Sequence, residues 1–565
     1  MATVTAGRDQ GAGVPAQQKI AHGPAPWADN NSTPRLIMRF GGGLNENTDP
    51  DIQECSTGYN FTLALNQQSF VPRPPFDLRA TAPNASAINA VLQLTTRASV
   101  ITTLIQAGDT VYLWDGATGF TSKATVNASS YLRGSYWSLG DYLVITDINL
   151  TNVVTKWDGT TYSNLTHTGI SGSLYAKFAV VHLNRVWLFN IKIDSTEYPH
   201  MILACKFEDP TNWDNSLRGG DTTVGGGSFS TGLEAFYLLT PDLKPINGVT
   251  FFQNTLVMST TNGHIFQLTG TSGKDFRFVD FFDTEPAIGV GQFASIGNDI
   301  VYLSRGGSIG LLFSTQNFGN VNLGDLSMWL PETTRNLAVI KAIVYDIENQ
   351  RVYFFITDKV LVLFKDILNR DRYQVRSGVS PWSVYITDDD KHFNTNHAAY
   401  IVDPGTTSYN TFFGDEAGRI FALNGSGNQD AGASPVLVSR RSRHIGADII
   451  QPWPWSEENL TGHLRYRRNT PLSLTVSVDW DDEYSTADSV VALKGPAGSD
   501  DAIYFNGTGA HAAYYGGPYY YNQGFTGTSR VSSININPGG KGPGFYLTIS
   551  TPTNVPFQVD ALEFD

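Results

Sequence analysis

The chain has few of the residues from which most active sites and cross-linked scaffolds are built. Only two of its 565 residues are cysteine, Cys55 and Cys205. Two isolated thiols give neither a disulfide framework nor a metal-ligand spacing, so we expect both to be structural. No apolar run approaches the roughly 20 residues needed to span a bilayer, and the N-terminus lacks the apolar core of a secretory signal. We therefore expect a soluble protein, without a membrane span, that is made in a cytoplasm.

Sequence signatures of catalysis are also missing. None of the ten histidines falls in a His-Glu-x-x-His arrangement, and no Gly-x-Ser-x-Gly or phosphate-loop motif is present. Acidic runs occur at Asp388–Asp390 and Asp479–Glu483. Adjacent carboxylates on one loop do not provide the opposed pair of a glycosidase, and neither run has EF-hand spacing. A weak cation site and a solvated turn stay open there. We predict no catalytic residue, no resident metal and no cofactor, and so no enzyme.

Charge is sparse and mostly negative. Charged residues make up 16% of the chain, below the usual quarter, and the formal net charge is −14. Tight binding of nucleic-acid phosphates needs clustered Lys and Arg, so DNA binding is not expected to be the main activity. The chain is instead rich in turn and strand formers, with 55 Gly, 27 Pro and 12% aromatic residues. This composition predicts an all-β protein.

One pattern recurs along the chain. In Gln106–Gly116 a glycine-polar pair precedes a run of β-formers, and Asp-Gly follows as a tight turn. Variants of the pattern follow at Asp141–Thr146, Asn184–Phe189, Asn254–Ser259, Asn298–Leu303, Gln350–Phe355 and Tyr409–Gly414. The central apolar residues of successive copies are 31, 44, 69, 45, 52 and 59 residues apart. Propeller blades of four strands take about 40–50 residues, so the copies predict about seven blades with insertions.

Second strands support this interpretation. Several copies are followed by another strand that ends on an aromatic residue or Leu, as at Asn152–Trp157 and Lys359–Phe364. A single hairpin is marginal in water, but blades that stack radially cover one another's apolar faces. We expect a β-propeller over 88–431, with an inserted loop within 205–247. Separate β-sandwich domains with similar strands are the alternative.

The two ends of the chain differ from the repeats. Residues 1–34 are rich in Gly, Ala, Pro and Gln, which predicts a flexible, extended N-terminal arm that is either disordered or becomes ordered against a neighbouring subunit. Within 35–87 we expect strands that join the propeller or a neighbouring subunit. The run Gly41, Gly42 and Gly43 lies there and suits close backbone contact at an interface. Alternating strands over 432–565 predict an additional β-sandwich-like C-terminal domain, with a Tyr-rich loop at 514–521.

The densest positive region lies in that last part of the chain. It consists of Arg440, Arg441, Arg443, Arg465, Arg467 and Arg468. If the two strands that carry them pair, the guanidinium groups converge on an acidic surface of a neighbouring subunit or on DNA phosphates. A solvated face is the simpler alternative. Trp453 and Trp455 are further interface candidates, since Trp is enriched at interfaces, although they could also stack on a sugar or nucleobase.

Three segments together resemble a known family. They are Arg39–Glu46 with Ser69–Arg73, the blade series that ends in Ser380–Ser383 and Tyr409–Phe421, and the C-terminal Gly544–Ile549 with Phe557–Leu562. The chain is similar to the tail nozzle proteins of short-tailed bacteriophages, of the packaged-DNA stabilisation and tubular tail type. The resemblance implies a structural virion protein in which six copies form a homohexameric ring at the distal end of the viral tail.

Partners and location also follow from the resemblance. The ring would contact tail adaptor and tail fibre or needle proteins during head-tail assembly in the host cytoplasm. Double-stranded DNA would pass transiently during DNA ejection, and an acidic wall would let phosphates slide. The insertion in 205–247 and the loop at 514–521 are candidates for a gate. Two other hypotheses stay open: a propeller that binds or degrades host-surface polysaccharide, and a cytoplasmic interaction scaffold.

Overall fold

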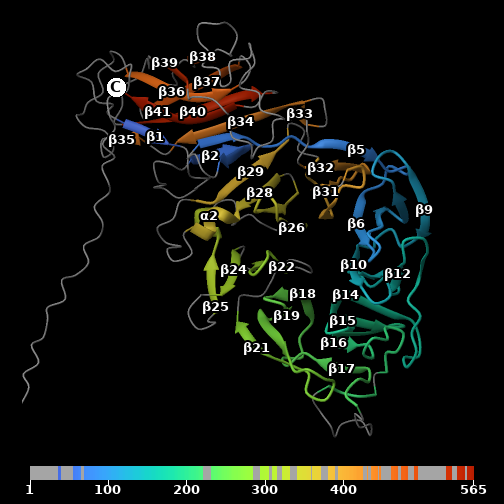
Figure 1. Ribbon diagram of the computed structural model, residues 1–565. Coiled ribbons are helices and arrows are strands. Elements are labelled where there is room, and N and C mark those ends of the chain that lie inside the picture. The colour runs from blue at the N-terminus through green and yellow to red at the C-terminus, as the bar shows by residue number, and fades with distance from the viewer. Residues whose placement is uncertain are drawn as a thin grey trace, which may run out of the picture.

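The computed structural model is an all-β protein (Figure 1). It describes residues 36–39, 55–64, 69–214, 216–219, 231–283, 293–304, 308–314, 321–330, 340–357, 359–370, 380–387, 392–406, 408–423, 429–430, 434–442, 445–446, 460–468, 472–480, 489–493, 530–536, 544–553 and 557–564. The helical elements among these residues are short, namely η1 (Ser327–Trp329) and α2 (Lys365–Arg370). The prediction of an all-β fold is confirmed.

Seven four-stranded antiparallel sheets follow one another around a ring, as the blades of a β-propeller (Figure 1). Blades 1 to 3 are β6 (Ile88–Thr95), β7 (Ile101–Ala107), β8 (Thr110–Trp114) and β9 (Phe120–Thr125); β10 (Leu132–Trp137), β11 (Tyr142–Asp147), β12 (Thr155–Trp157) and β13 (Tyr162–Asn164); and β14 (Leu174–His182), β15 (Arg185–Ile193), β16 (Thr196–Ala204) and β17 (Phe236–Leu239). Blades 4 to 6 are β18 (Ile246–Phe252), β19 (Thr255–Thr260), β20 (His264–Thr269) and β21 (Arg277–Asp283); β22 (Phe293–Ser295), β23 (Ile300–Leu303), β24 (Ile309–Ser314) and β25 (Val321–Asp325); and β26 (Ala342–Asp346), β27 (Arg351–Phe355), β28 (Lys359–Phe364) and β29 (Trp382–Ile386).

Blade 7 is assembled from both sides of the repeat series. It consists of β30 (Ala398–Val402), β31 (Tyr409–Gly414), β32 (Arg419–Ala422) and, as its outermost strand, β5 (Asp77–Thr81). The innermost strands β6, β10, β14, β18, β22, β26 and β30 contact one another in that order, and β30 contacts β6. The ring is therefore closed by an early strand, one of those expected within 35–87, which completes the last blade.

The first repeat occupies a different position within its blade than predicted. Six of the seven copies are the second strands of their blades, but the copy at Gln106–Gly116 centres on β8, the third strand of blade 1. The second strand of that blade is β7, with Leu104 near its middle, and the distance to Leu143 in β11 is 143 − 104 = 39 residues. The short spacing of 31 residues arose because the same turn-and-strand pattern occurs at the third strand of blade 1 and at the second strand of blade 2.

The polar residue that opens several copies has a conformational reason. Asp141, Asn184, Asn254 and Gln350 each directly precede a second strand and have positive φ angles of 55°, 54°, 64° and 52°. Asn and Asp tolerate this left-handed region better than other side chains with a Cβ. The repeating signal in the sequence is therefore the tight turn between the first and second strands.

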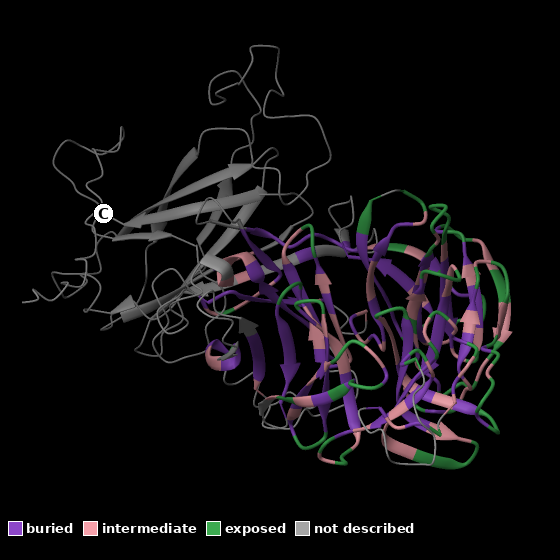
Figure 2. Cartoon of the chain, turned by 60° about the horizontal axis from the view of Figure 1, so that its bottom comes forward, coloured by how far each residue is buried: buried purple, intermediate pink, exposed green. Residues whose placement is uncertain are grey.

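Large aromatic side chains pack between blades, and most strand residues of the propeller are buried (Figure 2). Trp114 of blade 1 lies 5.7 Å, centroid to centroid, from Phe412 of blade 7. Trp157 Nε1 of blade 2 donates to Thr102 Oγ1 of blade 1, and Trp382 Nε1 of blade 6 donates to the carbonyl of Leu326, next to blade 5. The aromatic residues of the repeats thus join neighbouring blades.

Both ends of the chain build a second β body. Its six-stranded sheet contains β1 (Leu36–Arg39), β3 (Phe61–Ala64), β4 (Ser69–Pro72), β36 (Leu460–Arg468), β39 (Arg530–Ile536) and β41 (Phe557–Phe564). Its seven-stranded sheet contains β2 (Cys55–Tyr59), β33 (Gln429–Asp430), β34 (Ser434–Ser442), β35 (Ile445–Gly446), β37 (Leu472–Trp480), β38 (Ser489–Leu493) and β40 (Gly544–Thr553). The strand pairings within both sheets are antiparallel. We call this the two-sheet body; its strands come from before and after the propeller.

Among the described residues, no helix is long and apolar enough to cross a membrane.

Candidate functional site

The predicted arginine patch is divided between two sheets. Arg440 and Arg441 lie on β34, which pairs with β2 and β40. Arg465, Arg467 and Arg468 lie on β36, which pairs with β39 and β41. Pairing of the two arginine-bearing strands, which the sequence left open, is therefore wrong, because both edges of each strand are occupied by other strands. A role of these residues at an interface stays a prediction.

Several other candidates fall outside the described residues. These are the arm at 1–34, Gly41, Gly42, Gly43, Arg443, Trp453, Trp455, the acidic run at 388–390 and the loop at 514–521.

Many of the described carboxylates build turns. Asp115 Oδ1 accepts from the backbone N–H groups of Ala117 and Gly119, at 2.8 and 3.0 Å. Asp158 Oδ1 plays the same part in blade 2, where it accepts from Thr160 and Thr161. Within the part of the chain that the structure describes, no group of three or more His, Cys, Asp or Glu side chains is arranged to hold a metal ion.

The most elaborate polar site joins the two-sheet body to blade 6. Asn60, between β2 and β3, has φ 59° and is 2% exposed. Its N–H donates to the carbonyl of Val384 at 2.7 Å, and its Oδ1 accepts from the N–H of Ile386 at 2.8 Å. Ser383 Oγ donates to the carbonyl of Phe61 at 2.6 Å. The β2–β3 turn is thus hydrogen-bonded along β29, the outermost strand of blade 6.

Arg73 lies at the centre of this junction and is 0% exposed. Its guanidinium forms an ion pair with Asp430 through two hydrogen bonds, one of them 2.8 Å long. Nε donates to Asn60 Oδ1 at 2.8 Å, and the remaining donors reach the carbonyls of Pro74 at 2.9 Å and Ile386 at 3.2 Å. All five N–H donors of the side chain therefore have acceptors, which is what a fully buried guanidinium requires.

Aromatic rings enclose the same guanidinium. Its central carbon lies 5.4 Å from the ring centroid of Phe76, 5.7 Å from that of Tyr385 and 5.8 Å from that of Phe393. Such cation–π contacts strengthen when water is excluded. Arg73 thus connects an N-terminal segment (Phe76), blade 6 (Tyr385) and the strand after the propeller (Asp430).

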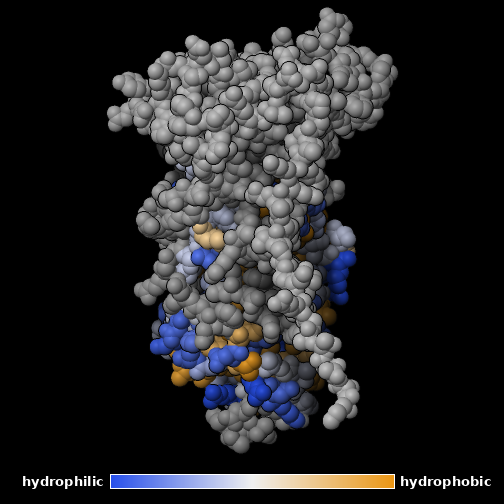
Figure 3. Space-filling view, turned by 90° about the vertical axis from the view of Figure 1, so that its left-hand side faces the viewer, coloured by the Kyte–Doolittle hydropathy of each residue, from blue (hydrophilic) through white to orange (hydrophobic). Residues whose placement is uncertain are grey.

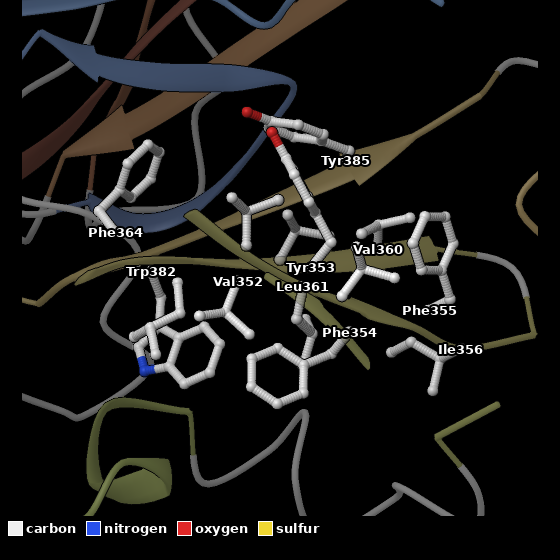
Figure 4. Close-up of a cluster of buried hydrophobic side chains, with 14 of the residues drawn as sticks. Val352, Tyr353, Phe354, Phe355, Ile356, Val360, Leu361, Phe364, Trp382 and Tyr385 are labelled. Carbon is white, nitrogen blue, oxygen red and sulfur yellow. The ribbon is translucent and has the colours of Figure 1, made fainter. Parts of the chain in front are cut away.

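Two tyrosines extend the junction into blade 6. The hydroxyl groups of Tyr353 and Tyr385 lie next to each other in Figure 4, and Tyr385 Oη is 2.8 Å from Thr62 Oγ1 of β3. Burial, opposed by the charge of Arg351, raises the pKa of Tyr353 well above its usual value. The Tyr353 hydroxyl is therefore neutral under ordinary conditions, and the contact with the two-sheet body is made by the Tyr385 hydroxyl.

Blades 7 and 1 meet at a different kind of seam. The Gln93 side chain donates to the carbonyl of Val402 at 2.7 Å and accepts from its N–H at 2.9 Å. Arg79 of β5 forms an ion pair with Asp403, at 2.7 Å. The turn at Gly116 lies against the 404–405 backbone. We call this set the closure seam.

Exposed apolar side chains are concentrated on one set of turns. Because every blade has four antiparallel strands, all innermost strands run in the same direction and their turns to the second strands lie on one face of the disc. Large exposed apolar residues at these turns are Val100, Ile101, Leu139, Leu183, Ile347 and Tyr409. We call this face the turn face. On the side of the molecule seen in Figure 3, hydrophobic and hydrophilic side chains of the described residues are interspersed.

Sequence reasoning missed the junction. Arg73 stands out only as a charge between prolines in Val71–Pro74, and Asp430 lies in a polar linker that was assigned no role. Their partnership spans 357 residues of sequence. A buried ion pair of this separation leaves no local pattern, although an arginine among prolines and aromatic residues was a usable signal.

Comparisons with known proteins extend the description of the fold only. No family model and no curated protein matches the chain. Virginiamycin B lyase from Staphylococcus aureus is 12% identical, with TM-score 0.38 over 61% of this chain and 98% of that one. The β-propeller domain of Swd1 from Myceliophteria thermophila is 11% identical, with TM-score 0.39 over 62% and 99%. At such values the matches carry no argument about function. The chain is a seven-bladed β-propeller protein with additional strands at both ends.

Proposed function

We propose that the protein is a structural, non-enzymatic subunit of a virion, one copy in the nozzle ring at the distal end of a short bacteriophage tail. In this role it retains the packaged DNA before infection and lets it pass during ejection. The proposal rests on the sequence resemblance, and the observation that carries it furthest is the junction around Arg73.

A subunit of a DNA conduit has to keep its domains in fixed positions while DNA under pressure passes. The junction supplies this property, because Asn60, Arg73 and Asp430 bind the two-sheet body to blade 6 by buried, fully partnered contacts. Apolar residues of both parts also share one core, including Phe61 and Leu63 from β3 and Phe354 and Trp382 from blade 6. An interaction scaffold of independent modules has no need for such a lock.

The turn face supports assembly with further copies. Exposed apolar side chains that gather on one face are typical of protein–protein contact surfaces. Leu139 and Leu183 are 43% and 47% exposed and belong to the turns of neighbouring blades. We propose that this face lies against a neighbouring subunit in the ring.

Native mass spectrometry of the full chain tests the assembly. We expect closed rings, and we expect Leu139→Asp with Leu183→Asp to shift the mass toward the monomer, because each change places a charge in an apolar contact. Lys244→Asp, an exposed change elsewhere, is the control and should leave the rings intact. If the double variant forms the same rings as the wild type, the turn face is not part of the interface. If the wild-type chain never assembles, the proposed ring does not exist.

A further inference from the structure

Two of the three charges carried by the innermost strands of the propeller are of the opposite sign to the protein as a whole. On the seven innermost strands the ionised side chains are Arg133 in β10, Lys177 in β14 and Asp346 in β26. Asp346 is 0% exposed, ends its strand and is bound by Asn349. Because the innermost strands run in the same direction, Arg133 near the start of β10 lies toward the other end of the axis. That end carries two cations in a chain of net charge −14.

Arg133 and Lys177 lie at the same level of adjacent strands. Arg133 pairs with Thr146 across β10 and β11, and Thr146 Oγ1 donates to the carbonyl of Lys177 at 3.2 Å. Along β14, the side chains do not alternate regularly between the two faces of the blade. Ala176 and Ala179, three residues apart, both pack against the apolar cluster shared with blade 2, while Phe178 packs against the cluster shared with blade 4. The irregularity therefore lies next to Lys177.

Neither cation has an ion-pair partner within the described part of the chain. Arg133 has one hydrogen bond, from Nη1 to the neighbouring carbonyl of Leu132 at 3.1 Å, and both side chains are partly accessible to water. The nearby carboxylate, Asp147, is 0% exposed, and its oxygens already accept from the backbone N–H groups of Tyr131, Asn149, Thr151 and Asn152. Burial, partly offset by Asp147, lowers the pKa of Arg133 to about 10, so the group remains protonated.

A third polar group lies at the same end of the innermost strands. His397 directly precedes β30, and its Nδ1 accepts from the N–H of Val91 in β6 at 3.1 Å. Burial and the charge of Arg133 hold the pKa of His397 well below its usual value, so the ring is neutral with its proton on Nε2. The Nε2–H has no protein acceptor among the described residues.

We propose that this end of the propeller axis binds a phosphate group, with Arg133 as the main ligand, Lys177 as a second cation and the His397 Nε2–H as a neutral donor. Unpaired cations beside hydrogen-bond donors, partly withdrawn from water, are what an oxyanion requires. Glu197, whose charge partly offsets the lowering of the Lys177 pKa by burial, is exposed and forms no ion pair with Lys177 among the described residues. The site is independent of the nozzle ring, because it lies within one propeller.

Phosphate binding to the full chain is measured by titration calorimetry and by broadening of the ³¹P resonance, against chloride of equal ionic strength. Inorganic phosphate and glycerol phosphate form two arms, which distinguish a free ion from a phosphomonoester. Arg133→Gln removes a charged hydrogen bond and should weaken binding roughly tenfold or more. Lys177→Gln should weaken it less, and Lys244→Gln, on an exposed connection, should not change it.

The outcomes separate clearly. Binding by the wild type that is lost in Arg133→Gln and kept in Lys244→Gln supports the site, and preference for one arm identifies the form of the phosphate. Equal binding by all three variants, or no phosphate-specific effect on the wild type, overturns it. If Arg133→Gln does not fold, as judged by circular dichroism, Lys177→Gln and the wild-type ³¹P measurement still decide.

Discussion

The junction and the closure seam hold the same chain together in different ways. At the junction, the fully buried guanidinium of Arg73 lies at the centre of the polar contacts between the two-sheet body and blade 6, together with the hydrogen bonds of Asn60 and Ser383. At the closure seam, the contacts are divided among the strand pairing of β5, the Gln93 amide and the ion pair of the partly exposed Arg79 with Asp403. The seven blades of the propeller can share strain, whereas most polar contacts of the junction meet at one buried charge. Damage to the junction should therefore be the more severe.

Replacing the junction arginine should have the largest effect. Arg73→Met leaves Asp430 buried without a counter-charge, and we expect the free energy of unfolding to fall by about 3–5 kcal/mol. Urea unfolding followed by tryptophan fluorescence measures the loss. Arg79→Met at the closure seam is the matched change and should cost less, about 1–3 kcal/mol, because Arg79 is 28% exposed and water can replace part of its contact with the buried Asp403. Equal losses at the two sites would contradict the comparison.

The double variant Arg73→Met with Asp430→Leu sharpens this result. Removing both charges abolishes the unpaired carboxylate, so most of the stability should return. A double variant as unstable as Arg73→Met would mean that the hydrogen bonds to Asn60 and Ile386, rather than the charge pair, hold the junction.

A second pair of variants probes the closure seam. Gly116 and Gly159 follow equivalent aspartates in blades 1 and 2, with φ angles of 88° and 94°. A Cβ at Gly116 would lie 2.6 Å from the N of Gly405, whereas at Gly159 its nearest neighbour is a methyl of Leu94 at 3.8 Å. Gly159→Ala should cost about 1–2 kcal/mol for the backbone alone, and Gly116→Ala about 1–3 kcal/mol more through overpacking. Calorimetric melting that gave both variants the same midpoint would show that blades 1 and 7 do not press together there.

Lowering the pH should reduce the stability of the propeller through His397. Its pKa is lowered by burial in the folded state, so the unfolded chain takes up the proton first. The stability linked to this group is complete above about pH 6.5 and falls as the pH drops below that value. His397→Asn keeps an acceptor for the Val91 N–H but cannot titrate, so its unfolding free energy should depend less on pH between about 6.5 and 5. An unchanged slope would assign the effect to other groups.

The smallest expected effect is at the thiols. Both cysteines are thiols outside any disulfide and 0% exposed, and burial raises the pKa of Cys205 to about 12. A thiol-reactive dye should label neither residue in the native protein and both in urea. Rapid labelling of Cys55 alone would indicate opening of the two-sheet body next to the junction.

The local features of this structure, its turns and strands, could be predicted from the sequence, but few of its long-range contacts could. Seven blades could be counted, because several of the turns from first to second strand use a residue such as Asn184 or Asn254 that accepts a positive φ. The first repeat was assigned to the wrong strand, since Gly108 makes the same kind of turn one strand later. The contacts of the junction join residues hundreds of positions apart, as Arg73 and Asp430 do, and such pairs have no periodicity to reveal them.

The joining of the two chain ends was also beyond local reasoning. The pattern over 432–565 predicts its own strands, but not that β1 to β4 extend the edges of the two sheets that they form. Nor does it indicate that β34 and β36, with their arginines, belong to different sheets. Strand order is set by long-range packing, which the alternation of apolar and polar residues within one strand does not reveal.

The central claim, a ring-forming structural subunit of a phage tail, is tested most directly by the native mass of the full chain at micromolar concentration, alone and with the neighbouring tail components of its virion. The account predicts a closed ring of six copies in at least the second condition. A monomer in both conditions would contradict it.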